Sequence, residues 1–240
     1  MLRPILVRKL RRYVAAIPAL AFGFVAGPAL AVTIDASGVT AGANSASFTG
    51  ATLTSTGGNL TKATSPGINP TSYIGVSGGA VANELDGSQK LTIAFSGGGA
   101  IVSEMVLGML FLSGQAGDKA NEAANAQTLG GTSCSVGIAN CILSATGVWR
   151  GSTTGVTNLS PATGGNGGIF RILNPFGSEV ISQLQLAPWL ISGTGAANSD
   201  FGLVSLTYTP VAPIPEPGTL MLVSLGMLGL VVAGRRRARS

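Results

Sequence analysis

The sequence predicts an all-β fold: a single β-sandwich or jelly-roll domain, preceded by a signal peptide and followed by a short hydrophobic helix. Three observations support this prediction. Short segments alternate apolar and polar residues, glycine-rich stretches separate these segments, and charged residues amount to only 10% of the 240 residues. That share is well below the roughly 25% of an average soluble protein, and most of the positive charge gathers at the two ends of the chain.

The domain predicted for residues 32–209 contains segments in which every second residue is apolar, as in a strand with one buried face. The side chains expected on buried faces are Leu91, Ile93, Phe95, Phe170, Ile172, Val180, Leu184, Leu186, Val204, Leu206 and Tyr208. Met105 to Leu112 is almost entirely apolar and predicts a central strand buried on both faces. Glycine-rich loops are expected at 96–99, 163–168 and 192–195, and only 118–126 holds a helical period.

The first 31 residues have the three parts of a signal peptide. Five basic residues lie within the first twelve, and 13–26 is an uncharged, mostly apolar stretch, too short for a comfortable permanent span. Pro28 breaks any helix, and Ala29 and Ala31 then provide the small residues that signal peptidase accepts. We expect export by the general secretion machinery and a mature protein that begins at Val32.

The middle of the chain is mildly acidic. Between Val32 and Gly234 there are five basic residues and nine acidic ones, a net charge of about −4. The basic pI of 9.7 therefore comes from the two ends. Proteins that bind nucleic acid draw on a concentrated Lys and Arg surface, which this region lacks, so no nucleic-acid partner is expected.

Cys134 and Cys141 are the only cysteines, with six residues between them. In an exported protein the oxidised pair is the expected state. A zinc site would need four ligands, usually Cys or His, and the chain has no histidine. We therefore predict a disulfide between Cys134 and Cys141 and no metal.

A proline-rich linker at 210–214 leads to the C-terminal segment, 215–240. This segment begins with Pro215, Glu216 and Pro217, and an uncharged stretch follows through Gly234. A membrane helix over about 219–234 would be slightly short for a hydrocarbon core of ~30 Å. The positive-inside rule predicts that the basic cluster after it stays cytoplasmic as a stop signal, while the prolines hold Glu216 extended at the membrane surface. The cluster consists of Arg235, Arg236, Arg237 and Arg239.

This order of elements resembles the PEP-CTERM sorting signal of Gram-negative bacteria. The resemblance covers about the last 27 residues and depends on Pro215, Glu216 and Pro217 before an apolar helix and an arginine tail. It implies recognition by an exosortase, a membrane-embedded transpeptidase-like cysteine enzyme that cuts near the motif and releases the protein or transfers it to the surface. It also implies a bacterium that makes exopolysaccharide, biofilm or floc matrix. Segments 84–95, 117–122 and 199–201 look like ectodomains found ahead of such tails, a likeness that assigns no activity.

No catalytic site is expected. Without histidine, the G-x-S-x-G pattern at 75–79 cannot belong to a Ser-His-Asp triad. Two carboxylates can hydrolyse a glycoside without histidine, but the spacing of the acids does not mark an acid and a nucleophile. The same acids are candidate calcium ligands, although no Asp-rich loop motif is present. Trp149 and Trp189 are expected to be packing or loop residues. The candidate acids are Glu84, Asp86, Glu104, Asp118 and Glu122.

The sequence therefore predicts an exported protein that is transiently anchored in the inner membrane, then sorted to the cell surface or the medium. A non-enzymatic role in an exopolysaccharide or biofilm matrix is expected, with extracellular polysaccharide as a candidate partner and no cofactor. Two alternatives stay open: a lectin-like sandwich that binds glycan or calcium, and a secreted glycan-active enzyme.

Overall fold

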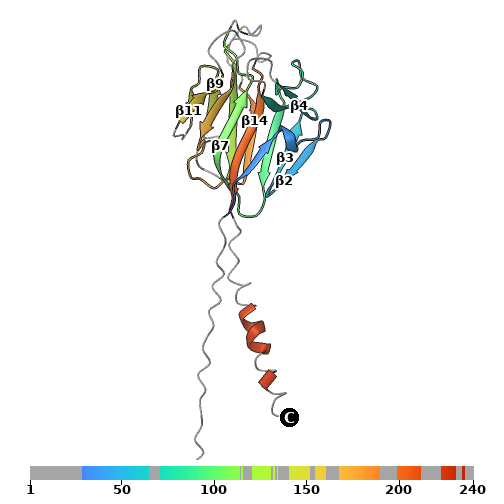
Figure 1. Ribbon diagram of the computed structural model, residues 1–240, viewed down its shortest axis with the longest axis vertical. Coiled ribbons are helices and arrows are strands. Elements are labelled where there is room, and N and C mark those ends of the chain that lie inside the picture. The colour runs from blue at the N-terminus through green and yellow to red at the C-terminus, as the bar shows by residue number, and fades with distance from the viewer. Residues whose placement is uncertain are drawn as a thin grey trace, which may run out of the picture.

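The computed structural model describes residues 29–64, 71–113, 115, 121–130, 132, 134, 141–151, 155–160, 168–189, 199–211, 223–230 and 234–235. Within these residues, strands form two antiparallel sheets that pack face to face as a sandwich, which confirms the predicted fold class (Figure 1). Helical residues 223–230 and 234–235 follow the sandwich. The sandwich elements are β1 (Val32–Asp35), η1 (Ala36–Gly38), β2 (Ser45–Phe48), β3 (Ala51–Thr56), β4 (Leu60–Thr64), β5 (Ser72–Val76), β6 (Lys90–Phe95), β7 (Ala100–Gly108), β8 (Ala123–Leu129), β9 (Cys141–Ser144), β10 (Trp149–Arg150), β11 (Gly155–Asn158), β12 (Phe170–Leu173), β13 (Gln183–Pro188) and β14 (Gly202–Pro210).

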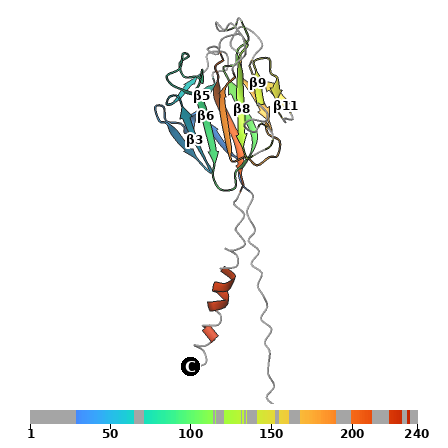
Figure 2. The same ribbon diagram turned by 180° about the vertical axis from the view of Figure 1, so that it is seen from behind.

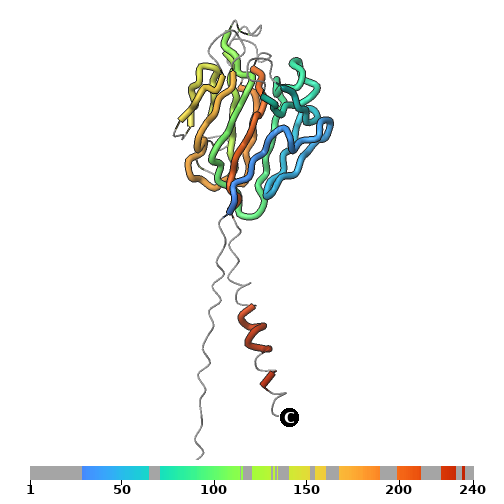
Figure 3. The backbone as a smooth tube through the Cα atoms, in the orientation of Figure 1, coloured from blue at the N-terminus to red at the C-terminus, as the bar shows by residue number. Residues whose placement is uncertain are grey.

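Each sheet joins strands that are distant in the sequence. Sheet A has the order β11-β12-β7-β14-β5-β4, and β1 also pairs with β14. Sheet B has the order β10-β9-β8-β13-β6-β3-β2. Because β1 pairs with β14, with Val32 opposite Tyr208, the first and last strands of the sandwich lie side by side (Figure 3).

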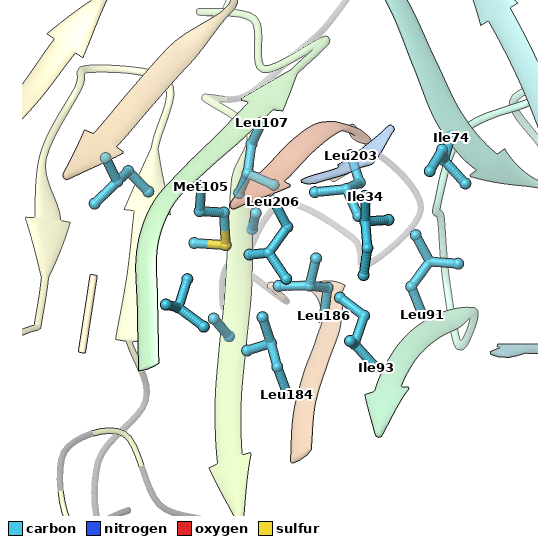
Figure 4. Close-up of a cluster of buried hydrophobic side chains, with 14 of the residues drawn as sticks. Ile34, Ile74, Leu91, Ile93, Met105, Leu107, Leu184, Leu186, Leu203 and Leu206 are labelled. Atoms are coloured by element: carbon cyan, nitrogen blue, oxygen red, sulfur yellow. The ribbon is translucent and has the colours of Figure 1, made fainter. Parts of the chain in front are cut away.

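The core lies between the two sheets and is made of aliphatic side chains from both (Figure 4). Alternation along each strand sends every second side chain inward, as the pattern predicts. Fully burying a side chain of this size contributes roughly 1.5–3 kcal/mol. Ten side chains at the centre have no exposed surface: Ile34, Ile74, Met105, Leu107, Leu203 and Leu206 from sheet A, and Leu91, Ile93, Leu184 and Leu186 from sheet B.

Two of the predicted inward positions are wrong by one residue. A register shift in β14 between Leu203 and Ser205 turns Val204 away from the core, so the fully buried side chain is that of Leu203. Before β13, Val180 is 38% exposed and Ile181 is buried instead, where it bridges to Ala100 at the start of β7. A single extra residue in a strand reverses which side chains face inward, and no feature of the apolar pattern marks where it falls.

Two predicted elements also differ in extent or type. β7 ends at Gly108, because Met109 adopts a positive φ of 65° that turns the chain out of the sheet, although residues 109–111 remain buried. The helical period at 118–126 does not correspond to a helix in its described part, because the strand β8 begins at Ala123. This alanine-rich strand is hydrogen-bonded on both edges, to β13 and β9, and this tertiary pairing overrides the helix propensity of alanine.

Candidate functional site

The sandwich has a proximal end, where β1 begins and β14 ends, and a distal end, where β7 ends and β14 begins. At the proximal end, Val32 lies opposite Tyr208, and the chain continues to Val211, which exchanges backbone hydrogen bonds with Gly98 and Gly99 at 3.3 and 2.8 Å. Ala29 to Ala31 precede β1 and are exposed. Residues 29–31 and Val211 therefore lie at the same end of the sandwich.

The C-terminal segment is described only in part. Helical residues 223–230 are exposed throughout, with Val223, Leu225 and Leu230 exposed by 56%, 61% and 71%. A helix whose apolar side chains all face outward has no partner in the sandwich core. The sorting residues Pro215, Glu216 and Pro217 lie outside the described residues, as do three of the basic residues predicted as a stop signal, while Arg235 is exposed. Those three are Arg236, Arg237 and Arg239.

Across the described part of the chain, no helix has both the length and the apolar character required to cross a membrane. The membrane helix predicted over about 219–234 includes 219–222 and 231–233, which lie outside the described residues.

Cys134 and Cys141 form a disulfide, as predicted. Their Cα atoms are 5.2 Å apart and both residues are 1% exposed, as part of the main hydrophobic core. Cys141 begins β9 and lies opposite Ala126 in β8, and the carbonyl of Cys134 accepts a hydrogen bond from Thr128 at 2.9 Å. The bridge therefore joins Cys134, which is hydrogen-bonded to β8, to the first residue of β9.

Three of the five candidate acids lie together at the distal end. Glu84, Asp86 and Glu122 are exposed by only 5%, 4% and 0%, and Asp200, at 6%, joins them. We call these four residues the acidic cluster. Glu104 is not part of it, because it lies within β7 opposite Leu173 and Thr207, and Asp118 lies outside the described residues.

Sequence reasoning did not select Asp200 as a candidate acid. The structure brings it to Glu84 through a bridge between Leu85 and Phe201, both of which are fully buried. The pattern that could have found the cluster is an acid directly beside a bulky apolar residue, as at Glu84–Leu85 and Asp200–Phe201. When the apolar side chain packs into the core at the end of a strand, the acid next to it in the sequence is placed at the edge of the core.

Hydrogen bonds hold the acidic cluster in place. Glu122 accepts from the backbone N–H of Phe111 at 2.6 Å and from that of Asp200 at 3.4 Å. The Asp200 carboxyl is within hydrogen-bonding range of Glu122 and Glu84, and the Tyr73 hydroxyl donates to Glu84 at 3.4 Å. Direct hydrogen bonding between carboxyl groups requires that at least one of them carries a proton.

Burial also shifts the acidity of two groups in this region. Loss of solvation raises the pKa of the Asp200 carboxyl, and the nearby charge of Asp86 adds to the rise, while hydrogen bonds to Glu122 and Glu84 oppose it. Burial likewise raises the pKa of Tyr73, and Glu84 adds to the effect. The described residues contain no group of three or more His, Cys, Asp or Glu side chains arranged to hold a metal ion.

The remaining motifs have structural roles where they are described. In the G-x-S-x-G pattern, a Cβ on Gly75 would collide with the carbonyl oxygen of Asn83, so this glycine permits a close backbone approach. Ser77 accepts a hydrogen bond from the backbone N–H of Asn59 at 3.0 Å in the turn after β5. Trp149 packs edge-on against Phe176, with the ring centroids 6.2 Å apart, whereas Trp189, just after β13, is partly exposed.

Comparison with known proteins identifies one segment of the chain. Residues 213–237 match the family described as the PEP-CTERM protein-sorting motif. No curated protein and no solved structure matches the chain. The motif implies export, transient sorting at a membrane and processing by an exosortase-type enzyme. The chain thus carries a PEP-CTERM protein-sorting motif in residues 213–237.

Proposed function

We propose that this chain is a non-enzymatic component of an extracellular or cell-surface matrix, delivered through its sorting motif. The observation that carries the proposal is the direct connection between sandwich and motif. β14 ends at Pro210, and the matched segment begins at residue 213. The folded cargo is therefore joined to the sorting signal by two intervening residues, Val211 and Ala212.

The proximal end of the sandwich supports a specific arrangement of the precursor. Before processing, the basic residues at both ends of the chain favour the cytoplasmic side. Because the start of β1 and the end of β14 lie beside each other, two neighbouring membrane segments can connect to the sandwich without deforming it. The distal end, with the acidic cluster, then faces away from the membrane. Signal peptidase would cut after Ala31, and the exosortase-type enzyme near Pro215, Glu216 and Pro217.

The acidic cluster favours a role other than glycoside hydrolysis. The two carboxyl groups of a glycosidase flank the scissile bond and stand about 5–9.5 Å apart. Glu84, Glu122 and Asp200 are instead at most 6% exposed and are joined by hydrogen bonds. Because these carboxyl groups are hydrogen-bonded to one another and to backbone N–H groups, they are not arranged to flank a scissile bond, and they fit a structural role at the distal end.

The surface composition suits a hydrated polymer environment. Charged residues are 10% of the chain, and the chain is rich in Gly, Ser, Thr and Asn. Such a surface offers many hydrogen-bonding groups and little long-range charge, so it can mix with polysaccharide without strong electrostatic repulsion. The disulfide is compatible with the oxidising conditions outside the cell.

The delivery half of the proposal is tested by replacing the motif. We expect Pro215→Ala, Glu216→Ala and Pro217→Ala together to retain the protein in the membrane fraction as an uncut precursor. Ala212→Ser, a change in the same linker but before the matched segment 213–237, should leave delivery at the wild-type level. Equal delivery of the motif variant and the wild type would contradict the proposed route.

The matrix half is tested by where the delivered protein resides. After gentle shearing of cells, we expect the wild-type protein to co-sediment with extracellular polysaccharide and to leave that fraction after glycanase treatment. Recovery only as free protein in the medium, in the presence of intact polysaccharide, would contradict a matrix role.

A further inference from the structure

The outer face of sheet B presents a row of uncharged polar side chains. Figure 2 views the molecule from the side of sheet B, where the sheet B strands β3, β6 and β8 are labelled. Gln185 in β13 lies opposite Gln127 in β8 and Thr92 in β6, and Thr92 lies opposite Thr54 in β3. Residues that are opposite each other across antiparallel strands point to the same face. The four side chains therefore form a continuous neutral row with hydrogen-bonding groups.

Two hollows lie at the distal end of this face, with volumes of about 400 and 330 Å³. Trp189 lines both of them. The space arises from small side chains, since Ala187 lines the first hollow and Ala123 the second. The backbone N–H of Trp189 donates to the carbonyl of Ala123 at 2.9 Å, which extends the pairing of β13 with β8 and fixes the tryptophan backbone between the hollows.

Asn125 lines the first hollow and has an unsatisfied polar atom. It is 9% exposed, and its Oδ1 has no hydrogen-bond partner among the described residues. The residues opposite it, Ala187 and Ile142, have aliphatic side chains that cannot donate a hydrogen bond. A buried polar atom without a partner costs about 1–3 kcal/mol. Because Oδ1 is itself buried, the Asn125 amide must turn toward the hollow before a ligand hydroxyl can donate to Oδ1 and remove that cost.

The composition of the first hollow limits the class of ligand. Its described lining contains amide side chains and one cation, Lys90, and no carboxylate. The described lining of the second hollow likewise contains one cation, Arg150, and no carboxylate. An apolar ligand would bury amides without partners, and a polymer with an anionic group on each sugar would find a single cation in each hollow, Lys90 or Arg150. A neutral sugar ring matches the lining, because its hydroxyl groups pair with amides and its C–H face packs on an indole.

We propose that the outer face of sheet B binds a neutral polysaccharide chain in a groove formed by Trp189, Asn125, Gln127 and Gln185. The chain occupies both hollows and passes over Trp189, so that more than one sugar ring is in contact. This proposal deepens the matrix role proposed above and depends on that role only for the source of the polysaccharide.

Binding is tested with the mature protein against soluble neutral polymers, namely dextran, mannan and galactan, and against anionic alginate. We expect measurable binding to at least one neutral polymer by affinity electrophoresis, and none to alginate. Trp189→Ala should weaken binding by about tenfold, whereas Trp189→Phe should retain most of it. Binding to alginate alone, or neutral-polymer binding that Trp189→Ala leaves unchanged, would overturn the proposal.

Three further variants separate binding from folding. Gln185→Ala should weaken binding, while Gln183→Ala, two residues earlier on the same face of β13 and outside the hollows, should not. Asn125→Ala should weaken binding without lowering the thermal midpoint, because it removes an unsatisfied atom and no hydrogen bond. A lower thermal midpoint for Asn125→Ala would assign Asn125 to the fold and overturn its role in the groove.

Failure of the groove and failure of the matrix role give different results. If the wild-type protein resides in the matrix but Trp189→Ala, Gln185→Ala and Asn125→Ala bind neutral polymers as the wild type does, the groove is wrong and the matrix role stands. If the purified protein binds a neutral polymer through Trp189 but is never found with extracellular polysaccharide, the groove stands and the matrix role is wrong.

Discussion

The fold of the sandwich and the sorting function of the C-terminal segment depend on residues that are distributed in different ways. In the sandwich, the residues that determine the fold are spread over strands of both sheets, and their inward side chains are buried. In the C-terminal segment, the sorting motif is concentrated in residues 213–237, where the described helical residues 223–230 are all exposed. A fold depends on the sum of many buried contacts, whereas recognition by another protein depends on a few exposed groups. Variants should therefore separate delivery from stability.

The largest effect is expected from the basic cluster after the apolar stretch. Replacing Arg235, Arg236, Arg237 and Arg239 with Gln removes the charges that hold this end in the cytoplasm. We expect loss of nearly all correctly processed protein and an unchanged thermal midpoint of the purified sandwich. Gel mobility of cell fractions measures the first and thermal unfolding the second. Normal processing without the arginines would show that the apolar stretch alone sets the orientation.

A core substitution should show the opposite behaviour. Phe201 is fully buried where β14 begins, and Phe201→Ala should lower the free energy of unfolding by about 3–5 kcal/mol. Leu159→Ala, at a side chain that is 42% exposed, should change it by less than about 0.5 kcal/mol. Urea unfolding measures both. Among exported molecules, cutting at the sorting motif should be equally efficient in the two variants, and a defect confined to Phe201→Ala would link folding to processing.

The disulfide should have an intermediate effect on stability and none on sorting. Removing it with Cys134→Ala and Cys141→Ala should lower the free energy of unfolding by about 2–3 kcal/mol, because the bridge restricts the unfolded chain. Chemical unfolding of the double variant, compared with the wild type under oxidising conditions, measures the difference. Equal stability of the two proteins would show that core packing alone holds the start of β9 in place.

The smallest effect is expected in the acidic cluster, and it has the opposite sign. Burial raises the pKa of Asp200 above 3.8, so the folded state binds this proton more tightly than the unfolded chain. The stability that this proton contributes is present below that value and is lost as the pH rises through the raised pKa. Asp200→Asn is neutral at every pH, and its amide can donate to Glu84 and Glu122. We expect it to increase the free energy of unfolding at neutral pH by about 1–2 kcal/mol.

Asp35 provides a control with the reverse pH dependence. A hydrogen bond from the Ser37 hydroxyl lowers the pKa of the Asp35 carboxyl, so the stability it contributes is present at neutral pH and is lost as the pH falls through the lowered pKa. Unfolding of Asp200→Asn and Asp35→Asn across the acidic range should therefore change the pH profile in opposite directions. A less stable Asp200→Asn protein at neutral pH would show that the fold requires the Asp200 carboxylate.

The sequence predicted the sandwich because alternation reports directly on burial. The inward faces of β6 and β12 and the Cys134–Cys141 disulfide are confirmed. Errors occurred where the backbone departs from regular pairing, as at Val204 beside the register shift in β14. A residue's neighbours in the sequence do not report such a shift, because it depends on the strand alongside.

The candidate sites were less predictable than the fold because they assemble through pairing between distant strands. The residues of the acidic cluster are separated by up to 116 positions in the sequence, from Glu84 to Asp200. The groove likewise combines Asn125 in β8 with Gln185 in β13, and neither residue belongs to a recognisable motif in its own segment. The sorting motif was the exception, since all of its residues are consecutive and need no tertiary structure to be recognised.

The central claim, that both ends of the chain are removed during delivery of the sandwich, is tested most directly by the intact mass of the protein recovered outside the cell. The account predicts a species that begins at Val32 and ends near Pro215, Glu216 and Pro217, without Arg235 and the residues after it. Extracellular protein that still contains the segment from Arg235 to Ser240 would contradict it.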